Sequence, residues 1–183
     1  MANDFSAEPN VLIAKVDAEA ENSKATAQDQ GVSSYPTIKY FSKGSKTSEA
    51  YAGGRSELDL VEFMNEKAGT HRMVGGGLDA TAGTIGALDI MVAKLTGSAD
   101  MASLSEDIKK AAGGVKDKYA EYYVKVSNKL VENKGYVDKE LARLEGLIKK
   151  GGLAPEKLDD LTLRSNILRK FKGEEPIMSK GEL

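Results

Sequence analysis

A helical pattern runs from Ala82 onward, and it constrains the fold more than any other feature of the chain. Apolar residues recur there at helical spacing, as at Leu141, Leu144 and Ile148, which predicts helices with one apolar face. Pro155 suits the first turn of such a helix. Helices are predicted at 82–95, 103–112, 115–132, 136–149 and 155–171. Because short glycine-containing breaks join them, neighbours should pack antiparallel into an all-α five-helix bundle.

Residues 1–70 show a different pattern, in which strand-like runs alternate with helical ones. Strands are predicted at 10–17, 37–41 and 49–52, and a polar surface helix is predicted at 18–30. The last two strands should form a β-hairpin. A further helix should begin at Ser56, because Asp59 stands at the spacing of a capping box. The first part of the chain is therefore predicted to be α+β.

A glycine triplet at 75–77 separates the two patterns. It fits neither of the two common phosphate-binding glycine motifs, so we interpret it as part of a linker. The predicted organisation is a first domain at 1–70, a glycine-rich linker at 71–81, a helical domain at 82–172 and a tail at 173–183.

The composition excludes several classes of function. The chain has no cysteine, so disulfides, thiolate zinc sites and thiol redox chemistry are excluded. His71 is the single histidine and is interpreted as a surface residue, so we expect no metal site and no cofactor. A net charge of -2 with interspersed acids and bases gives no basic face for nucleic acid. We expect no membrane insertion and find no signal peptide in these residues.

The loop before the second predicted strand contains Tyr35, Pro36 and Thr37. The residue before a proline is disfavoured in the helical region. A peptide bond that precedes proline is also the place where the cis isomer is accessible, although the sequence does not fix the isomer here. Taken alone, these residues are typical of a proline that opens a strand after a turn.

Together with Ala14-Lys15-Val16-Asp17 and Tyr51-Ala52-Gly53-Gly54-Arg55, this loop resembles the second half of a catalytic, a-type thioredoxin domain of the protein disulfide-isomerase family. The segments at 118–123, 140–144 and 164–168 resemble the all-helical D domain of some members. The resemblance implies an α+β partial thioredoxin fold followed by the all-α five-helix bundle. It also implies that the dithiol belongs to a part of the domain that this sequence does not contain.

The resemblance suggests roles for several residues. It implies that Tyr35, Pro36 and Thr37 bind substrate polypeptide, and that Arg55 is the arginine that stabilises a thiolate, although no thiol is present here. Tyr119, Tyr122 and Tyr123 could line a hydrophobic cleft for unfolded polypeptide or could be ordinary packing residues, and both interpretations stay open. The adjacent carboxylates Asp159 and Asp160 do not face each other on a helix, so we interpret them as a solvated face.

The final residues, Lys180, Gly181, Glu182 and Leu183, resemble the endoplasmic-reticulum retrieval signal Lys-Asp-Glu-Leu. For a full-length parent protein, this implies the lumen of the endoplasmic reticulum and the retrieval receptor as a partner.

Three functional hypotheses remain. In the first, the chain is a non-catalytic family member that assists folding by binding unfolded or nascent polypeptide. In the second, it is a fragment of an active thiol–disulfide oxidoreductase. The third is a helical adaptor or dimerisation module, and a homodimer is left open. In each case we expect this chain to be redox-inactive by itself.

The first domain is expected to be loosely structured, because a small hairpin with one helix is marginally stable. The strand at 10–17 would lack its usual neighbours, unless it pairs directly with 37–41.

Overall fold

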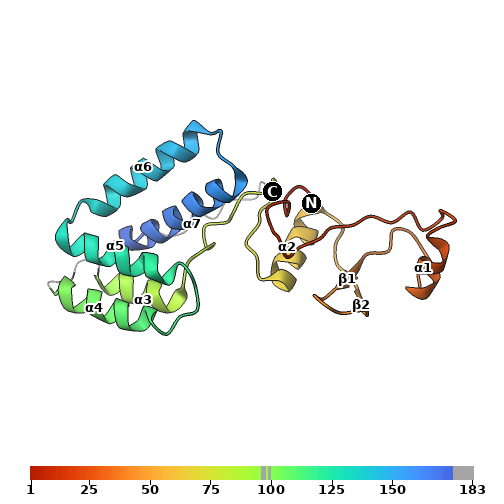
Figure 1. Ribbon diagram of the computed structural model, residues 1–183, viewed down its shortest axis with the longest axis horizontal. Helices are drawn as coiled ribbons and strands as arrows, with labels where there is room; N and C mark the ends of the chain where they lie inside the picture. Colours follow the sequence, from red (N-terminus) through yellow and green to blue (C-terminus); the bar gives the residue numbers. More distant parts are fainter. Residues whose placement is uncertain (96–97, 99, 175–183) are drawn as a thin grey trace. The chain divides into compact units, whose positions relative to one another are not determined.

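The computed structural model describes residues 1–95, 98 and 100–174, and it divides the chain into two compact units (Figure 1). The first unit runs from Met1 to Gly77 and the second begins at Leu78. The division falls within the segment that the sequence suggests as a linker. No helix in the described ranges is long and apolar enough to cross a membrane.

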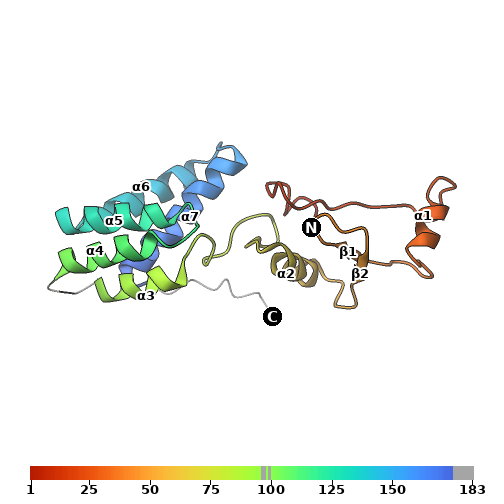
Figure 2. The ribbon, with the colours of Figure 1, turned by 60° about the horizontal axis from the view of Figure 1, so that its bottom comes forward.

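The second unit is the all-α bundle that the sequence predicts. Its helices are α3 (Gly86–Leu95), α4 (Met101–Ala112), α5 (Ala120–Glu132), α6 (Tyr136–Lys150) and α7 (Pro155–Lys172). Proline stands in the first turn of α7, and Gly173 ends that helix with a positive φ of 70°. The main packing pairs are α4 with α5 and α6 with α7, while α3 contacts both pairs (Figure 2).

Apolar side chains from all of these helices form one core. Leu88, Ile108, Val126, Leu144 and Phe171 are among its members, and each is at most 1% exposed. The helical spacing of apolar residues places them on one face of each helix, so the bundle buries a continuous apolar interior.

Asn166 ties the segment before α3 to α7. Its side-chain nitrogen donates to the carbonyls of Asp79 and Ala82, at 2.9 and 3.1 Å. Its side-chain oxygen accepts a hydrogen bond from Arg169. Close by, Gly83 passes over Leu163 with a positive φ of 75°, and a Cβ at Gly83 would lie 2.7 Å from a Leu163 methyl carbon. This crossing therefore requires glycine.

The first unit contains a two-stranded antiparallel sheet and two helices. The strands are β1 (Lys39–Phe41) and β2 (Ser48–Ala50), and the helices are α1 (Lys24–Asp29) and α2 (Glu57–Ala68). The sheet pairs Lys39 with Ala50 and Phe41 with Ser48. The predicted hairpin is confirmed with shorter strands, and α1 is shorter than the predicted helix at 18–30.

The predicted capping box at the start of α2 is confirmed. Ser56 Oγ accepts from the backbone N–H of Asp59 at 3.1 Å, and the Asp59 carboxylate accepts from the backbone N–H of Ser56 at 3.0 Å. These hydrogen bonds satisfy backbone donors that would otherwise lack partners at the helix start.

The prediction of a strand at 10–17 is wrong. These residues form no strand and do not pair with β1, and Leu12 and Val16 are 88% and 61% exposed. A strand requires a hydrogen-bonded neighbour as well as a suitable local sequence, and none of the described residues supplies one.

The segment that follows α2 is joined to the amino-terminal turns by an ion pair. Arg72 is 5% exposed, and its Nε donates to the Glu8 carboxylate at 2.6 Å. Arg72 also donates through Nη1 to the carbonyl of Gly76, at 2.9 Å. The side chain of Asn65 bonds both the N–H and the carbonyl of Arg72. This polar cluster orders the end of the first unit, while His71 is exposed as expected.

Candidate functional site

The Tyr35–Pro36–Thr37 loop lies exposed immediately before β1. The Tyr35–Pro36 peptide bond is cis, and the Tyr35 side chain is 61% exposed. Thr37 Oγ1 donates to the carbonyl of Ser34 at 2.6 Å, which closes the loop on itself. The loop therefore presents an aromatic side chain to solvent beside the start of a strand.

The structure brings Arg55 to this loop. Its Nη2 donates to the carbonyl of Pro36 at 3.4 Å, across 19 residues of sequence. Arg55 is exposed and immediately precedes the capped start of α2. With no cysteine in the chain, its guanidinium bonds the loop backbone and has no thiolate of this chain to stabilise.

Further apolar side chains of the first unit are exposed. Phe41 at the end of β1 is 46% exposed, in addition to Leu12, Val16 and Tyr35. In the described part of this unit, Phe5 and Val61 are the apolar side chains that are buried. The unit therefore exposes much of the apolar surface that would otherwise form a core.

In the second unit, the three candidate tyrosines lie at the start of α5 and are all buried. Tyr119 and Tyr122 are each 7% exposed, and Tyr123 is fully buried. These values favour the packing role over an open cleft. Burial raises the pKa of each tyrosine, to about 12 for Tyr119, where the Asp160 carboxylate adds to the effect.

Tyr123 connects α5 to the start of α3. Its hydroxyl donates to the Asp89 carboxylate at 2.5 Å and accepts from the backbone N–H of Ile85 at 3.0 Å. Partial burial raises the pKa of Asp89, and the hydrogen bond from Tyr123 opposes that rise. The sequence does not reveal this pair, because the two residues are 34 positions apart.

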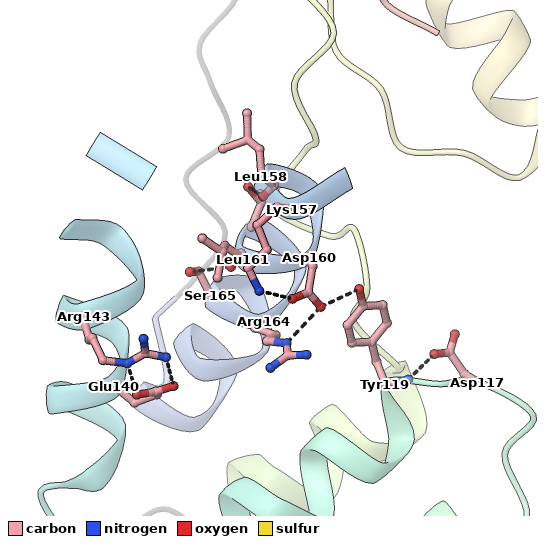
Figure 3. Close-up of polar contacts among 11 residues, drawn as sticks. Asp117, Tyr119, Glu140, Arg143, Lys157, Leu158, Asp160, Leu161, Arg164 and Ser165 are labelled. Carbon is pink, nitrogen blue, oxygen red and sulfur yellow. Dashed lines mark hydrogen bonds and ion pairs between the residues drawn. The ribbon is translucent and has the colours of Figure 1, made fainter. Parts of the chain in front are cut away.

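Asp160 is the centre of a second polar cluster, which joins α7 to the segment before α5 (Figure 3). Its carboxylate accepts from Arg164 Nε at 3.0 Å, Tyr119 Oη at 3.4 Å and Lys157 Nζ at 3.4 Å. The Asp160 side chain is 24% exposed, so the solvated face suggested by the sequence is only partly solvated at this residue. A long-range partner such as Tyr119 gives no local sequence signal.

Tyr122 differs from its two neighbours because its hydroxyl is buried without a hydrogen-bond partner among the described residues. The guanidinium carbon of Arg164 lies 5.2 Å from the centre of the Tyr122 ring. On α6, Arg143 and Glu140 form a two-point ion pair, with both N–O distances at 2.8 Å (Figure 3). These hydrogen bonds lower the pKa of Glu140.

Lys180, Gly181, Glu182 and Leu183, the retrieval-like sequence, lie outside the described residues. In the part of the chain that the structure describes, no group of three His, Cys, Asp or Glu side chains could hold a metal ion.

Comparison with known protein families matches both parts of the chain. Residues 1–66 match the thioredoxin family. Residues 83–171 match the family described as "Endoplasmic reticulum protein ERp29, C-terminal domain". The second match covers the helical bundle from the segment before α3 to the end of α7.

Individual relatives align with nearly all of the chain. It is 63% identical over 175 residues to "Protein disulfide-isomerase tigA" of Aspergillus niger, covering 96% of this chain and 48% of that protein. It is 54% identical over 187 residues to "Protein disulfide-isomerase erp38" of Neurospora crassa, covering 100% of this chain and 51% of that protein. "Probable protein disulfide-isomerase A6" of Medicago sativa is 39% identical over 174 residues, which is 91% of this chain and 47% of that protein.

The chain therefore spans about half the length of these relatives. The small sheet with its cis-proline loop agrees with a partial thioredoxin fold, and the bundle agrees with the ERp29-type domain. On these grounds the chain belongs to the protein disulfide-isomerase family.

Proposed function

We propose that this chain assists protein folding in the endoplasmic reticulum by binding unfolded or nascent polypeptide, without thiol chemistry of its own. The observation that carries the proposal is the unpaired edge of β1 beside the exposed Tyr35–Pro36–Thr37 loop. β1 pairs with β2 on one side, and no other described strand pairs with it. An extended polypeptide can bind such an edge through its backbone and place alternate side chains against the surface.

The exposed apolar side chains near this edge support the same proposal. Phe41 ends β1 and Tyr35 lies in the loop before it, and both side chains are substantially exposed. Unfolded polypeptides expose apolar side chains that folded proteins bury, so they are the partners that gain most from contact with such residues.

The proposed compartment rests on two observations. The sequence of Lys180, Gly181, Glu182 and Leu183 is similar to a retrieval signal, and the description of the family matched by residues 83–171 names the endoplasmic reticulum. The retrieval receptor is then a second proposed partner.

The names of the relatives favour a second candidate, thiol–disulfide isomerisation by a longer polypeptide that supplies a dithiol. In that case Tyr35, Pro36 and Thr37 would bind the substrate and Arg55 would act on the thiolate. Association through the helical unit, including a homodimer, stays a prediction.

Binding to a permanently unfolded protein tests the main proposal. We expect fluorescently labelled, reduced and carboxymethylated α-lactalbumin to bind the full chain, as measured by fluorescence anisotropy. Replacing Phe41→Gln should weaken binding about tenfold, because burial of a large apolar side chain contributes about 1.5–3 kcal/mol.

Val131→Gln is the matched control, since Val131 is 40% exposed on α5 of the other unit. It should change the affinity by less than about twofold, since single surface substitutions usually have small effects. Equal loss in both variants, or equal binding of native α-lactalbumin, would contradict the proposal.

A further inference from the structure

The Tyr122 hydroxyl is the most informative unexplained group in the helical unit. It is the one buried side-chain polar atom of the described second unit that has no hydrogen-bond partner, and Tyr122 is 7% exposed. A buried hydroxyl without a partner destabilises a fold, and such groups are uncommon in native proteins. Phenylalanine would fill the same space without this penalty. The presence of a tyrosine here therefore suggests that its hydroxyl binds a group other than the residues it contacts in the fold.

Arg164 supplies a second donor beside the Tyr122 ring. Its guanidinium lies over the Tyr122 ring, 5.2 Å from the ring centre. Nε is occupied by Asp160, whereas neither Nη atom donates to any residue that the structure describes. The Arg164 side chain is 39% exposed, so it reaches solvent while it covers the aromatic ring. A long, partly exposed side chain of this kind can move to admit a ligand.

Two cations and one carboxylate act electrostatically on the Tyr122 hydroxyl, namely Arg164, Arg143 and Glu140. Arg143 forms a two-point ion pair with Glu140, and that carboxylate makes no hydrogen bond with Tyr122. Lys125, exposed one helical turn after Tyr122 on α5, also acts on Glu140 electrostatically. Glu140 is acted on by Lys125, Arg143 and Arg164, and Asp160 is bonded by Lys157 and Arg164. The hydroxyl is protonated at neutral pH, since an ordinary tyrosine pKa is about 10 and burial raises the pKa of Tyr122 further, so it can donate a hydrogen bond.

We propose that Tyr122 and Arg164 form a binding site for a carboxylate group of a polypeptide. Tyr122 Oη donates one hydrogen bond to the carboxylate and an Nη atom of Arg164 donates a second. Hydrogen bonds of this charge-assisted kind are stronger than neutral ones, so the pair discriminates a carboxylate from an amide. This inference rests on the proposed polypeptide-binding function and adds the chemical group that the helical unit recognises. An acidic side chain and a carboxyl terminus carry the same group.

Three fluorescein-labelled peptides with the same apolar sequence distinguish these sources. The first has a central Glu and an amidated carboxyl terminus, and the second has Gln in place of Glu. The third has the central Gln with a free terminal carboxylate. Fluorescence anisotropy with the full chain should show at least one carboxylate peptide binding about tenfold more tightly than the Gln amide, as expected for a hydrogen bond to a charged group. The peptide that binds more tightly than the Gln amide shows whether the site recognises an acidic side chain or a carboxyl terminus.

Substitutions then assign the effect to the two residues. Tyr122→Phe should abolish the preference for the carboxylate while leaving the affinity for the Gln amide unchanged, and its thermal midpoint should be no lower than that of the wild type. Arg164→Gln should reduce the preference as well. Tyr119→Phe is the matched control and should keep the preference, because the Tyr119 hydroxyl already has Asp160 as its partner.

Several outcomes would overturn this inference. If the wild type binds all three peptides equally, the polypeptide-binding function stands and the carboxylate site does not. Retention of the preference by Tyr122→Phe would also refute the site. A lower thermal midpoint in Tyr122→Phe would mean that the hydroxyl has a partner within the fold. If no peptide binds, both the site and the proposed function fail.

Discussion

Tyr122 and Tyr123 are consecutive residues on α5, yet their hydroxyl groups have opposite surroundings. The Tyr123 hydroxyl donates to Asp89 and accepts from the Ile85 N–H, so both of its functions are used inside the fold. The Tyr122 hydroxyl has neither kind of partner among the described residues. At the scale of single residues, the effect of a buried hydroxyl on the stability of the fold depends on whether it has hydrogen-bond partners.

Removal of these two hydroxyls should therefore have different effects on stability. Tyr123→Phe is expected to lower the free energy of unfolding by about 1–3 kcal/mol, because it leaves the partly buried Ile85 N–H and the Asp89 carboxylate without this partner. Tyr122→Phe should leave the stability unchanged or raise it. Urea unfolding of both variants, followed by circular dichroism, measures the difference. Equal destabilisation would refute the described hydrogen-bond pattern.

Asp89 should make stability depend on pH. Partial burial raises its pKa in the folded state, so the folded protein binds this proton more readily than the unfolded chain. The ionised carboxylate therefore costs stability at pH 7, and this cost disappears as the pH falls through the raised pKa. Asp89→Asn should stabilise the protein at pH 7, by less than about 1 kcal/mol because solvent screens this half-exposed group.

The gain from Asp89→Asn should shrink as the pH is lowered toward 4, near the ordinary pKa of Asp, about 3.9. Urea unfolding of wild type and variant at several pH values would reveal this trend. A variant that is less stable than the wild type by a constant amount across that range would contradict it.

At the scale of elements, the contact between the start of α3 and α7 depends on one glycine. Gly83 has a positive φ, and a Cβ there would lie 2.7 Å from a Leu163 side-chain carbon. Gly173, after α7, also has a positive φ, but nothing lies within 4 Å of the position of its Cβ. Alanine substitutions at the two glycines therefore distinguish the cost of a left-handed backbone from the cost of steric overlap.

Gly173→Ala should lower the free energy of unfolding by about 1–2 kcal/mol, the cost of a left-handed backbone for a residue with a side chain. Gly83→Ala adds the steric overlap with Leu163, which should lower the free energy of unfolding by about 1–3 kcal/mol more. Thermal or urea unfolding of the two variants provides the comparison. If Gly83→Ala is the milder substitution, the packing described at this crossing is incorrect.

Elements whose signals are local could be predicted from the sequence. Pro155 and the spacing of Leu141 and Leu144 predict helices of the bundle, and Ser56 with Asp59 predicts the start of α2. The strand at 10–17 could not be judged in this way, because strand formation depends on a neighbour elsewhere in the chain.

The same limit applies to the candidate site. The sequence resemblance identified the loop at Tyr35 and its partner Arg55, which the structure places in contact. It did not identify the bond between Tyr119 and Asp160, which are 41 positions apart. Likewise, only the arrangement in space shows that Tyr122 lacks a partner while Arg164 covers its ring.

At the scale of the whole molecule, the two units differ in how much apolar surface they bury. The second unit has a continuous core that includes Leu88, Val126 and Phe171. Among the described residues of the first unit, the buried apolar side chains are Phe5 and Val61. Because buried apolar area is the main stabilising contribution to folding, the second unit should be the more stable one.

Amide hydrogen exchange should show this difference directly. Amides at 12–17 should exchange rapidly, because these residues lie outside helices and strands and their N–H groups form no backbone hydrogen bond within the described residues, whereas amides in the middle of α5 and α7 should be the most protected. Mass spectrometry with peptide resolution can measure both sets in one experiment. Uniformly slow exchange from 11 to 63 would contradict the account of the first unit.

The central claim is that the chain binds unfolded polypeptide and carries out no thiol chemistry, and insulin turbidity in dithiothreitol tests both parts together. A thiol oxidoreductase shortens the lag before the reduced B chain precipitates, whereas a polypeptide-binding protein lowers the amount that precipitates. Because the chain has no cysteine, we predict an unchanged or longer lag and a final turbidity that falls as the protein concentration rises. A shortened lag, or a final turbidity equal to that without the protein, would contradict the account.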